Sequence, residues 1–248
     1  MTLDLKNLDL SKINKENVKI DVGLAIDAPH SAHWLLTEEN PFVIGVEPNP
    51  KNISIMTEGR PVPEADFPYL VLNDNAVRVK GVTSKTYDPN QFFLVSGAID
   101  DVGPTPAKSK FYCTADLNTG CSSLLKPTDA LGVGVEAEID VDVYSLEYVL
   151  DQLGLQDIES IKLVKTDAQG KDFDVVKSLG KYLHKTVALK CEYNVRDQYE
   201  NPFNHSEFFD FMVKNGFTIV HNDGYDAYFL NYRFPSNLQK VFNLPRGV

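Results

Sequence analysis

Carboxylate side chains follow most of the apolar runs in this sequence of 248 residues. These runs predict strands, and the acids at or just after their ends are Asp21, Glu47, Asp100, Asp101, Asp167 and Glu192. In open sheets built from alternating strands and helices, ligands bind just beyond the carboxyl ends of the strands. We therefore expect these acids to surround one pocket, where they would bind hydroxyl groups or a cation, or accept a proton from a reacting group.

The first two strand ends indicate the class of cofactor. Gly23 lets the backbone approach a ligand closely, and Glu47 suits the paired hydroxyls of a ribose. A dinucleotide would also place its pyrophosphate on the next helix N-terminus. The sequence there has the anion Asp27 and then Pro29, which lacks an N–H donor. Because a carboxylate would oppose a pyrophosphate by about 1–4 kcal/mol, the pattern favours S-adenosylmethionine, which is cationic and has no phosphate.

Hydrophobic periodicity and turn residues predict alternating strands and helices. The expected strands are 18–23, 42–46, 91–99, 161–166, 186–193, 217–221 and 227–230, with a further hairpin around 111–125. The expected helices are 27–36, 145–154, a stripe over 173–183, and 204–214, with Asp27, Ser145 and Asn204 as N-cap residues. This order, which finishes in a hairpin, predicts one α/β domain whose mostly parallel sheet has an antiparallel edge.

Two stretches stand apart from this pattern. Residues 1–17 are polar with scattered leucines, and we expect them to form an N-terminal lead-in segment before a domain at 18–248. Residues 57–90 carry Pro61, Pro63 and Pro68 among several charges. Such a long excursion in a compact domain is typical of a functional loop, so it is interpreted as a substrate lid or an insertion.

Composition excludes several function classes. The net charge is −11 and the pI is near 4.9, and an acidic surface repels phosphate backbones, so no nucleic-acid partner is expected. No apolar run reaches the length of about 18 residues that a membrane span needs. The first residues lack the basic-then-apolar order of a secretion signal, which favours a cytoplasmic location. Cys113, Cys121 and Cys191 form no even framework, so free thiols are expected.

Six segments, taken in order, resemble the FkbM family of methyltransferases. They are IDVGLAI at 20–26, VIGVEPNP at 43–50, SGAID at 96–100, GCSSL at 120–124, LVKTDAQG at 163–170 with DVVK at 174–177, and AYFLN at 227–231. They are similar to the family's I-D-V-G-A-N-I-G, V-I-A-F-E-P-x-P, N-x-A-V-G-D, G-x-S-S-L, L-I-K-I-D-V-E-G-x-E-x-x-V-L-K and D-x-x-F-x-N motifs. The resemblance implies a Rossmann-like class I methyltransferase fold, with a mostly parallel seven-stranded sheet and an antiparallel C-terminal hairpin. It also implies S-adenosylmethionine as the donor and a hydroxyl acceptor, such as that of a sugar or a macrolide.

The matched positions imply a set of cofactor-binding residues. These are Asp21, Gly23, Leu24, Asp27, Glu47, Pro48, Ala98, Ile99 and Asp100. Asp21 would hold the methionine ammonium, Glu47 the ribose, and residues 98–100 the adenine. Two residues depart from the family pattern: Asp27 replaces the second glycine of the first motif, and Gln169 replaces the glutamate of D-V-E-G. The second change removes a carboxylate from that position.

Asp167, which ends the middle strand, is the leading candidate to take the proton of the acceptor hydroxyl. His205 and His30 are alternatives, because a histidine is better matched to neutral pH. Asp167, Glu192 and Asn194 also offer oxygen ligands at adjacent strand ends. They would bind Mg²⁺, as in catechol-type O-methyltransferases, and the ion would lower the pKa of the acceptor. In the alternative interpretation, Glu192 and Asn194 only form hydrogen bonds with loops.

The predicted function is an S-adenosylmethionine-dependent O-methyltransferase that acts on a hydroxyl of a sugar, a glycan or a related small molecule. Two other classes stay open. One is an NAD-dependent oxidoreductase, and the other is a non-catalytic binding module with a degenerate cofactor site, which Asp27 and Gln169 motivate. The sequence does not identify the acceptor, and it allows a homodimer as well as a monomer.

Overall fold

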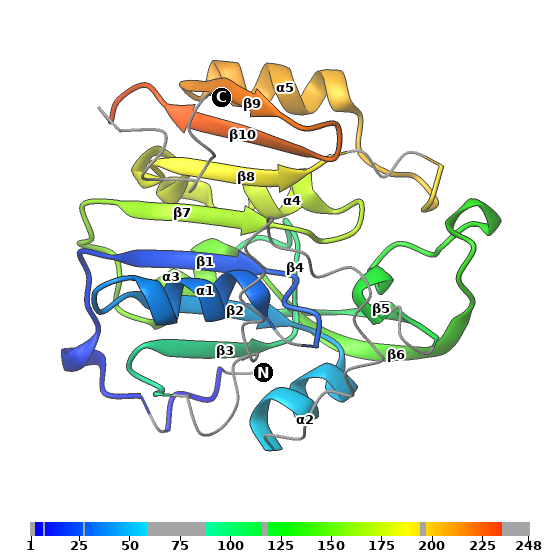
Figure 1. Ribbon diagram of the computed structural model, residues 1–248, viewed down its shortest axis with the longest axis horizontal. Coiled ribbons are helices and arrows are strands. Elements are labelled where there is room, and N and C mark those ends of the chain that lie inside the picture. The colour runs from blue at the N-terminus through cyan, green and yellow to red at the C-terminus, as the bar shows by residue number, and fades with distance from the viewer. Residues whose placement is uncertain are drawn as a thin grey trace.

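The computed structural model describes residues 3–6, 8–26, 28–58, 88–115, 119–193 and 197–234. Its centre is a seven-stranded sheet with the strand order β3-β2-β1-β7-β8-β10-β9 (Figure 1). The strands of this sheet are β1 (Val18–Val22), β2 (Phe42–Glu47), β3 (Phe92–Ser96), β7 (Ile161–Thr166), β8 (Ala188–Glu192), β9 (Phe217–Asn222) and β10 (Asp226–Asn231). The helices are α1 (Pro29–Thr37), α2 (Pro50–Glu58), α3 (Leu146–Gln152), α4 (Asp172–Lys177) and α5 (His205–Lys214).

The pairing within this sheet confirms the predicted fold. β1 pairs in parallel with β2 and β7, and parallel pairing continues outward to β3 and β8. β10 pairs antiparallel with both β8 and β9. The chain first builds outward from β1 to β3 and later returns to β7 on the other side of β1. Strand order therefore reverses between β1 and β7, which is where such sheets form a ligand-binding crevice. This is the topology of a Rossmann-like methyltransferase fold.

Helices cover both faces of the sheet. Residues of α1 and α2 pack on one face in a buried cluster that includes Trp34, Met56 and Leu163. Residues of α3, α4 and α5 pack on the other face in a larger cluster that includes Val164. Leu163 and Val164 are neighbours on β7 and enter different clusters because successive side chains of a strand point to opposite faces. Figure 1 shows α1 in front of β1 and β2, and α5 along the edge beside β9.

A second, smaller sheet extends the carboxyl-end side of the domain (Figure 1). It consists of β4 (Ala98–Ile99), β5 (Ala107–Thr114) and β6 (Val135–Tyr144), in the order β4-β6-β5. β6 was not among the predicted strands, although its apolar and acidic residues alternate from Val135 to Val143. The hairpin expected at 111–125 was wrong, because the strand partner of β5 is β6. β5 meets the later segment through a bridge between Tyr112 and Ser123 and through hydrogen bonds between Thr114 and Ser122.

Three other local predictions were wrong. The N-cap of α1 is Ala28, which precedes a proline and is therefore kept out of the right-handed helical region; Asp27 lies outside the described residues. The strand expected at 91–99 breaks at Gly97, where a Cβ would lie 2.7 Å from the Asp142 carbonyl oxygen, so the chain leaves the large sheet and continues as β4. The helix expected through Leu183 ends at Lys177, and a separate 3-10 helix, Gly180–Lys185, follows it.

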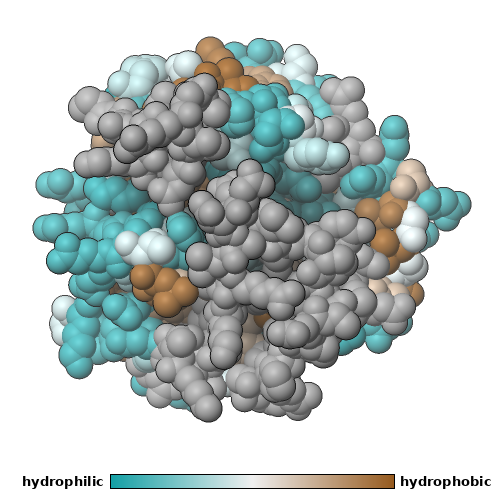
Figure 2. All heavy atoms as spheres, viewed as in Figure 1, coloured by the Kyte–Doolittle hydropathy of each residue, from teal (hydrophilic) through white to brown (hydrophobic). Residues whose placement is uncertain are grey.

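The two stretches outside the pattern are described only in part. In the lead-in segment, Leu10–Lys12 form a 3-10 helix, and Ile13 is buried in the larger core cluster. Of the predicted lid at 57–90, residues 59–87 lie outside the described residues. Within the described ranges, no helix has the length and apolar character needed to cross a membrane. The described surface visible in Figure 2 is mostly hydrophilic with small apolar patches, in keeping with the acidic composition.

The ends of β1 and β7 approach so closely that only a glycine fits at position 23 without strain, and this can be tested. This residue has φ +83°, and a Cβ there would lie 2.0 Å from the Asp167 carbonyl oxygen. Gly23→Ala therefore combines left-handed strain with steric overlap, and we expect it to lower the free energy of unfolding by about 2–4 kcal/mol. Gly103→Ala is the matched control, because φ there is +76° and nothing lies within 4 Å. We expect it to cost about 1 kcal/mol. Urea unfolding would measure both, and equal losses would contradict the close approach.

Candidate functional site

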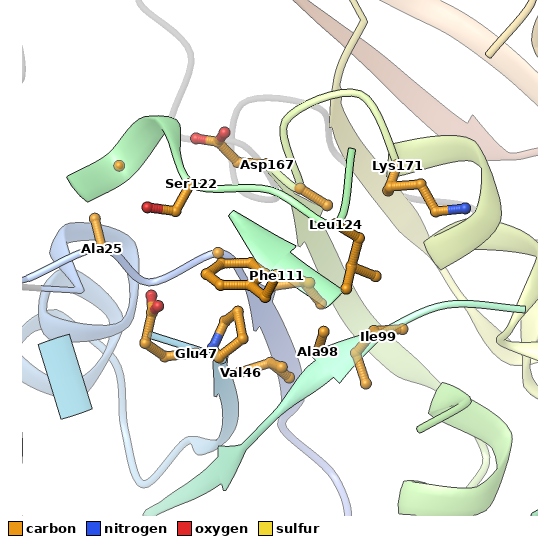
Figure 3. Close-up of a pocket in the computed structure, with 15 residues that line it drawn as sticks. Ala25, Val46, Glu47, Ala98, Ile99, Phe111, Ser122, Leu124, Asp167 and Lys171 are labelled. Carbon is orange, nitrogen blue, oxygen red and sulfur yellow. The ribbon is translucent and has the colours of Figure 1, made fainter. Parts of the chain in front are cut away.

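A pocket opens at the carboxyl ends of β1, β2 and β7, where strand order reverses. It is lined by Val22, Gly23, Ala25, Val46, Glu47, Pro48, Ala98, Ile99, Phe111, Gly120, Ser122, Leu124, Asp167, Ala168 and Lys171 (Figure 3). Five of the predicted cofactor residues lie in this lining: Gly23, Glu47, Pro48, Ala98 and Ile99. The walls are mainly apolar, and two carboxylates interrupt them. In Figure 3 these carboxylates, of Glu47 and Asp167, are seen on separate sides of the Phe111 ring.

Glu47 stands at the end of β2 and is 4% exposed. Its Oε1 accepts a hydrogen bond of 2.8 Å from the backbone N–H of Asn49. Burial raises the pKa of the Glu47 carboxyl to about 8, against the opposing effect of the Asn49 and Ala25 N–H groups and the Asn52 amide. A carboxyl so close to protonation gains from any ligand that donates hydroxyl hydrogen bonds to it.

Asp167 follows β7 and is the more exposed of the two carboxylates, with 40% of its side chain accessible. Its Oδ2 lies 3.6 Å from the Lys165 ammonium, and its Oδ1 accepts a hydrogen bond of 2.6 Å from the Gln169 amide. Burial acts to raise the pKa of Asp167, but Lys165 and Gln169 outweigh it and hold this pKa below its ordinary value. Asp167 is therefore an anion at neutral pH.

Asp21 lies deeper than the predicted role suggested. It is 1% exposed, and its Oδ2 accepts hydrogen bonds from the backbone N–H (3.0 Å) and hydroxyl (2.6 Å) of Ser31 on α1. Its Oδ1 lies 3.3 Å from the Lys165 ammonium. The Asp21 carboxylate thus already binds the Lys165 ammonium and the first turn of α1. Leu24, another predicted cofactor residue, is fully buried in the core on the α1 side.

Asp100 is also engaged with protein groups. Its carboxylate lies 3.0 Å from the ammonium of Lys171, which also contacts Asp174 at 2.6 Å. Figure 3 shows the Lys171 amine pointing away from Glu47 and Asp167. Asp100 therefore stands beside the pocket rather than in its lining, while Ala98 and Ile99 form part of the wall.

Of the three residues predicted to bind Mg²⁺, the structure describes Asp167 and Glu192. Asn194 lies outside the described residues. Glu192 does approach Asp167, but the amide nitrogen of Gln169 donates to both, over 2.6 Å to Asp167 and 2.8 Å to Glu192. Burial, followed by the charges of Asp167 and Asp172, raises the pKa of Glu192 well above its ordinary value. Across the described ranges, no group of three His, Cys, Asp or Glu side chains is placed to hold a metal ion.

The two candidate histidines occupy different surroundings. The Nε2 of His30, on α1, lies 3.4 Å from the ammonium of Lys190, which pairs with Asp226 at 2.9 Å. Burial, followed by the positive charges of Lys165 and Lys190, holds the pKa of His30 well below its ordinary value. His205 begins α5, and its ring packs against Tyr193 and Phe203. Neither histidine belongs to the pocket lining.

Sequence reasoning missed several lining residues, of which Phe111, Ser122, Leu124 and Lys171 are the clearest. Ser122 and Leu124 lie in the GCSSL segment, which was noted only as part of the resemblance. Phe111 reaches the pocket because β5 pairs with β6, opposite Ile139. The alternation of apolar and acidic residues over 135–144 was the available signal for that pairing. No signal singled out Lys171.

The buried carboxyl of Glu47 predicts a pH-dependent stability. The pKa of this carboxyl rises from 4.5 to about 8 on folding. The protonated carboxyl therefore adds a contribution to stability that is fully present below pH ~4.5 and is lost as the pH rises towards ~8. Glu47→Gln has no titrating group at this position, so its stability does not fall in this way. Between about pH 5 and pH 8 the free energy of unfolding of Glu47→Gln should therefore rise relative to wild type by roughly 3–4 kcal/mol.

Urea unfolding at several pH values would measure this difference. Glu138→Gln is the control, because Glu138 is exposed on β6 and lies outside the pocket lining. A constant difference between wild type and Glu47→Gln across this range would show that Glu47 is not protonated by its burial.

Comparison with known proteins agrees with the topology and the pocket. The family model described as the methyltransferase FkbM domain matches residues 21–219. That range includes every strand end that lines the pocket. Searches among curated proteins and among solved structures returned no match. Because the family model covers most of the chain, the resemblance noted in the sequence is confirmed, and the chain belongs to the FkbM methyltransferase family.

Proposed function

We propose that this protein is an S-adenosylmethionine-dependent O-methyltransferase whose acceptor is a hydroxyl of a sugar, a glycan or a related small molecule. The observation that carries the proposal is that Glu47 and Asp167 line the same mainly apolar pocket, at the point where strand order reverses. Glu47 suits the hydroxyls of a ribose, and Asp167 is an anion suited to a cationic sulfonium. Asp167, not the proposed ammonium-binding Asp21, is the anion that faces this pocket.

The residues present fit such a cofactor. Glu47 offers acceptor oxygens to the ribose hydroxyls, beside the Ala25 backbone. Ala98, Ile99, Phe111 and Leu124 form an apolar wall that suits an adenine ring. The methionine portion would lie towards Gly23 and Asp167, where the backbones of β1 and β7 approach closely. A phosphate-bearing dinucleotide fits less well, because Pro29 at the start of α1 has no N–H and the N–H of Ser31 in the first turn already donates to the Asp21 carboxylate.

The chain's own part in the reaction is alignment and proton handling. When bound, S-adenosylmethionine supplies an activated methyl group and a neutral leaving group. Asp167 stays ionised at neutral pH, so it can accept a hydrogen bond from the acceptor hydroxyl and take its proton as the oxygen becomes bonded to carbon. Lys165 and Gln169 hold the two oxygens of this carboxylate from different sides. That restriction keeps the hydroxyl in one orientation.

The surroundings of Asp167 support a polyhydroxyl acceptor. The charge of Lys190 acts on Asp167, and Lys190 also pairs with Asp226 at the start of β10. Charged and hydrogen-bonding groups on several strand ends suit an acceptor with several hydroxyls more than an apolar one. The same groups would orient one hydroxyl among chemically similar neighbours.

Cofactor selection is tested by thermal unfolding with separate ligands. S-adenosylhomocysteine at about 100 times its Kd should stabilise the protein by about 2.7 kcal/mol, whereas NAD should leave the unfolding temperature unchanged. Glu47→Ala should remove most of the response, because it deletes the group proposed to hold the ribose. A response to NAD alone would favour an oxidoreductase, and no response to either ligand would favour a non-catalytic module.

The role of Asp167 is tested by Asp167→Asn. The amide keeps the shape but cannot take a proton, so we expect methyl transfer to fall by about 100-fold or more, while the Kd of S-adenosylhomocysteine changes little. Transfer of a labelled methyl group to a panel of sugars and glycans would measure the first quantity, and calorimetry the second. Asp140→Asn, an exposed change on β6, is the control. Wild-type turnover in Asp167→Asn would remove Asp167 from the mechanism.

A further inference from the structure

A single amide group joins the two carboxylates at the ends of β7 and β8. The Nε2 of Gln169 lies 2.6 Å from Oδ1 of Asp167 and 2.8 Å from Oε2 of Glu192. An amide NH₂ has two hydrogens, so it can donate one to each carboxylate. The nitrogen therefore stands in the position between two acidic side chains where a shared cation would otherwise lie.

The orientation of this amide is fixed by its other end. The Oε1 of Gln169 accepts a hydrogen bond of 2.7 Å from the hydroxyl of Tyr199, which also lies 2.8 Å from the carbonyl oxygen of Cys121. Tyr199 has a single hydroxyl hydrogen, which it can donate to Gln169 or to Cys121. A reversed amide could donate to the Tyr199 oxygen, but it would turn Oε1 towards Asp167 and Glu192 and lose both hydrogen bonds to them. The side chain thus has one favourable orientation.

The backbone of Gln169 is fixed as well. Its φ is +53°, which is uncommon for a residue with a side chain. Its carbonyl oxygen accepts a hydrogen bond of 2.8 Å from the hydroxyl of Ser123. Tyr199 is itself tied to Pro127 by a bridge. Contacts from two other segments therefore hold the amide against the two carboxylates.

A magnesium ion would need what this arrangement does not offer. Mg²⁺ binds oxygen ligands at about 2.1 Å in octahedral geometry, whereas the Gln169 nitrogen presents hydrogens to the space between the acids. An ion at that point would collide with the NH₂ group and would break its hydrogen bonds. The residues present therefore do not fit the predicted Mg²⁺ site, and the reason is the position of this amide.

We propose that Gln169 is a positioning residue whose amide takes the place of a divalent cation between Asp167 and Glu192. The proposal rests on the proposed function for its catalytic meaning, since Asp167 is the group that would receive the acceptor's proton. The neutral amide holds the two carboxyl groups together and adds no positive charge. The acceptor hydroxyl would then be activated by Asp167 alone and would not be ionised beforehand by a metal.

Replacing the Gln169 amide with a carboxylate, or removing it, should create a cation-binding site at the position that the amide now occupies. Gln169→Glu puts a third carboxylate beside the other two, and a cation relieves their repulsion. Gln169→Ala empties the position and leaves two carboxylates facing each other. Both variants should bind a divalent cation more tightly than wild type does.

The test is Mn²⁺ binding to the cofactor-free protein, measured by electron paramagnetic resonance of the free ion. Wild type should show only weak binding. Gln169→Glu should bind one Mn²⁺ at least tenfold more tightly, and Gln169→Ala should show a smaller gain. Gln156→Glu is the matched control, because Gln156 is exposed and its amide contacts only a carbonyl oxygen of Asp151 among the bonds seen. It makes the same change of charge and should leave Mn²⁺ affinity at the wild-type level.

A double variant locates the ion. Asp167→Asn in the Gln169→Glu background should abolish the added Mn²⁺ binding. Mn²⁺ should raise the melting temperature of Gln169→Glu by more than it raises that of wild type. A purely structural role for Gln169 would lower stability without creating this cation dependence.

Two results would overturn the proposal. One is tight Mn²⁺ binding by wild type that is lost in Asp167→Asn, and the other is no gain in either Gln169 variant. If Gln169→Glu does not fold, the wild-type and Gln169→Ala measurements still decide between these outcomes. S-adenosylhomocysteine binding is measured separately on the same proteins. A gain of Mn²⁺ binding without any cofactor binding would uphold the amide bridge and reject the proposed function.

Discussion

A buried ammonium group organises the carboxyl edge of the sheet. Lys165, on β7, is 5% exposed, and its Nζ donates to the carbonyl oxygen of Gly23 at 2.8 Å while lying 3.3 Å from Asp21 and 3.6 Å from Asp167. Burial acts to lower the pKa of this lysine, but Asp21 and Asp167 outweigh it, so its pKa is raised. A charge in this position ties β1 to β7 at the point where the pocket opens. Removing either carboxylate would leave part of that charge without compensation, which is costly in a protein interior.

This constraint divides the acids at the sheet edge into separate roles. Asp21 is used in folding, because it holds Lys165 and the first turn of α1. Asp167 shares the same lysine but remains accessible, and it is kept ionised. At Glu47 the effect of burial outweighs the charge of Lys165 and keeps the carboxyl near protonation. Glu47 and Asp167, at nearby strand ends, thus differ in charge state because their neighbours differ. Two groups whose environments push their pKa values apart are typical of a functional site.

Sequence reasoning succeeded where local patterns decide the structure. The strands at 18–23, 42–46 and 161–166 are rich in apolar residues, as expected for a parallel sheet covered on both faces. The acidic residue at or after each of these strands could therefore be placed at one edge. Contacts between distant segments were beyond this reasoning. Nothing near Asp21 in the sequence indicates that Lys165 neutralises it, and nothing near Gln169 indicates Tyr199. The strand at 135–144 was missed although its alternation was visible, because the neighbouring strand 107–114 is only partly apolar.

The most direct test of the account is a crystal structure of the protein with S-adenosylhomocysteine. The account predicts the ribose hydroxyls within hydrogen-bond distance of Glu47, the adenine between Ile99 and Leu124, and the sulfur on the side of the pocket that Asp167 faces. A nucleotide bound in another part of the protein, or a ribose that makes no contact with Glu47, would contradict it.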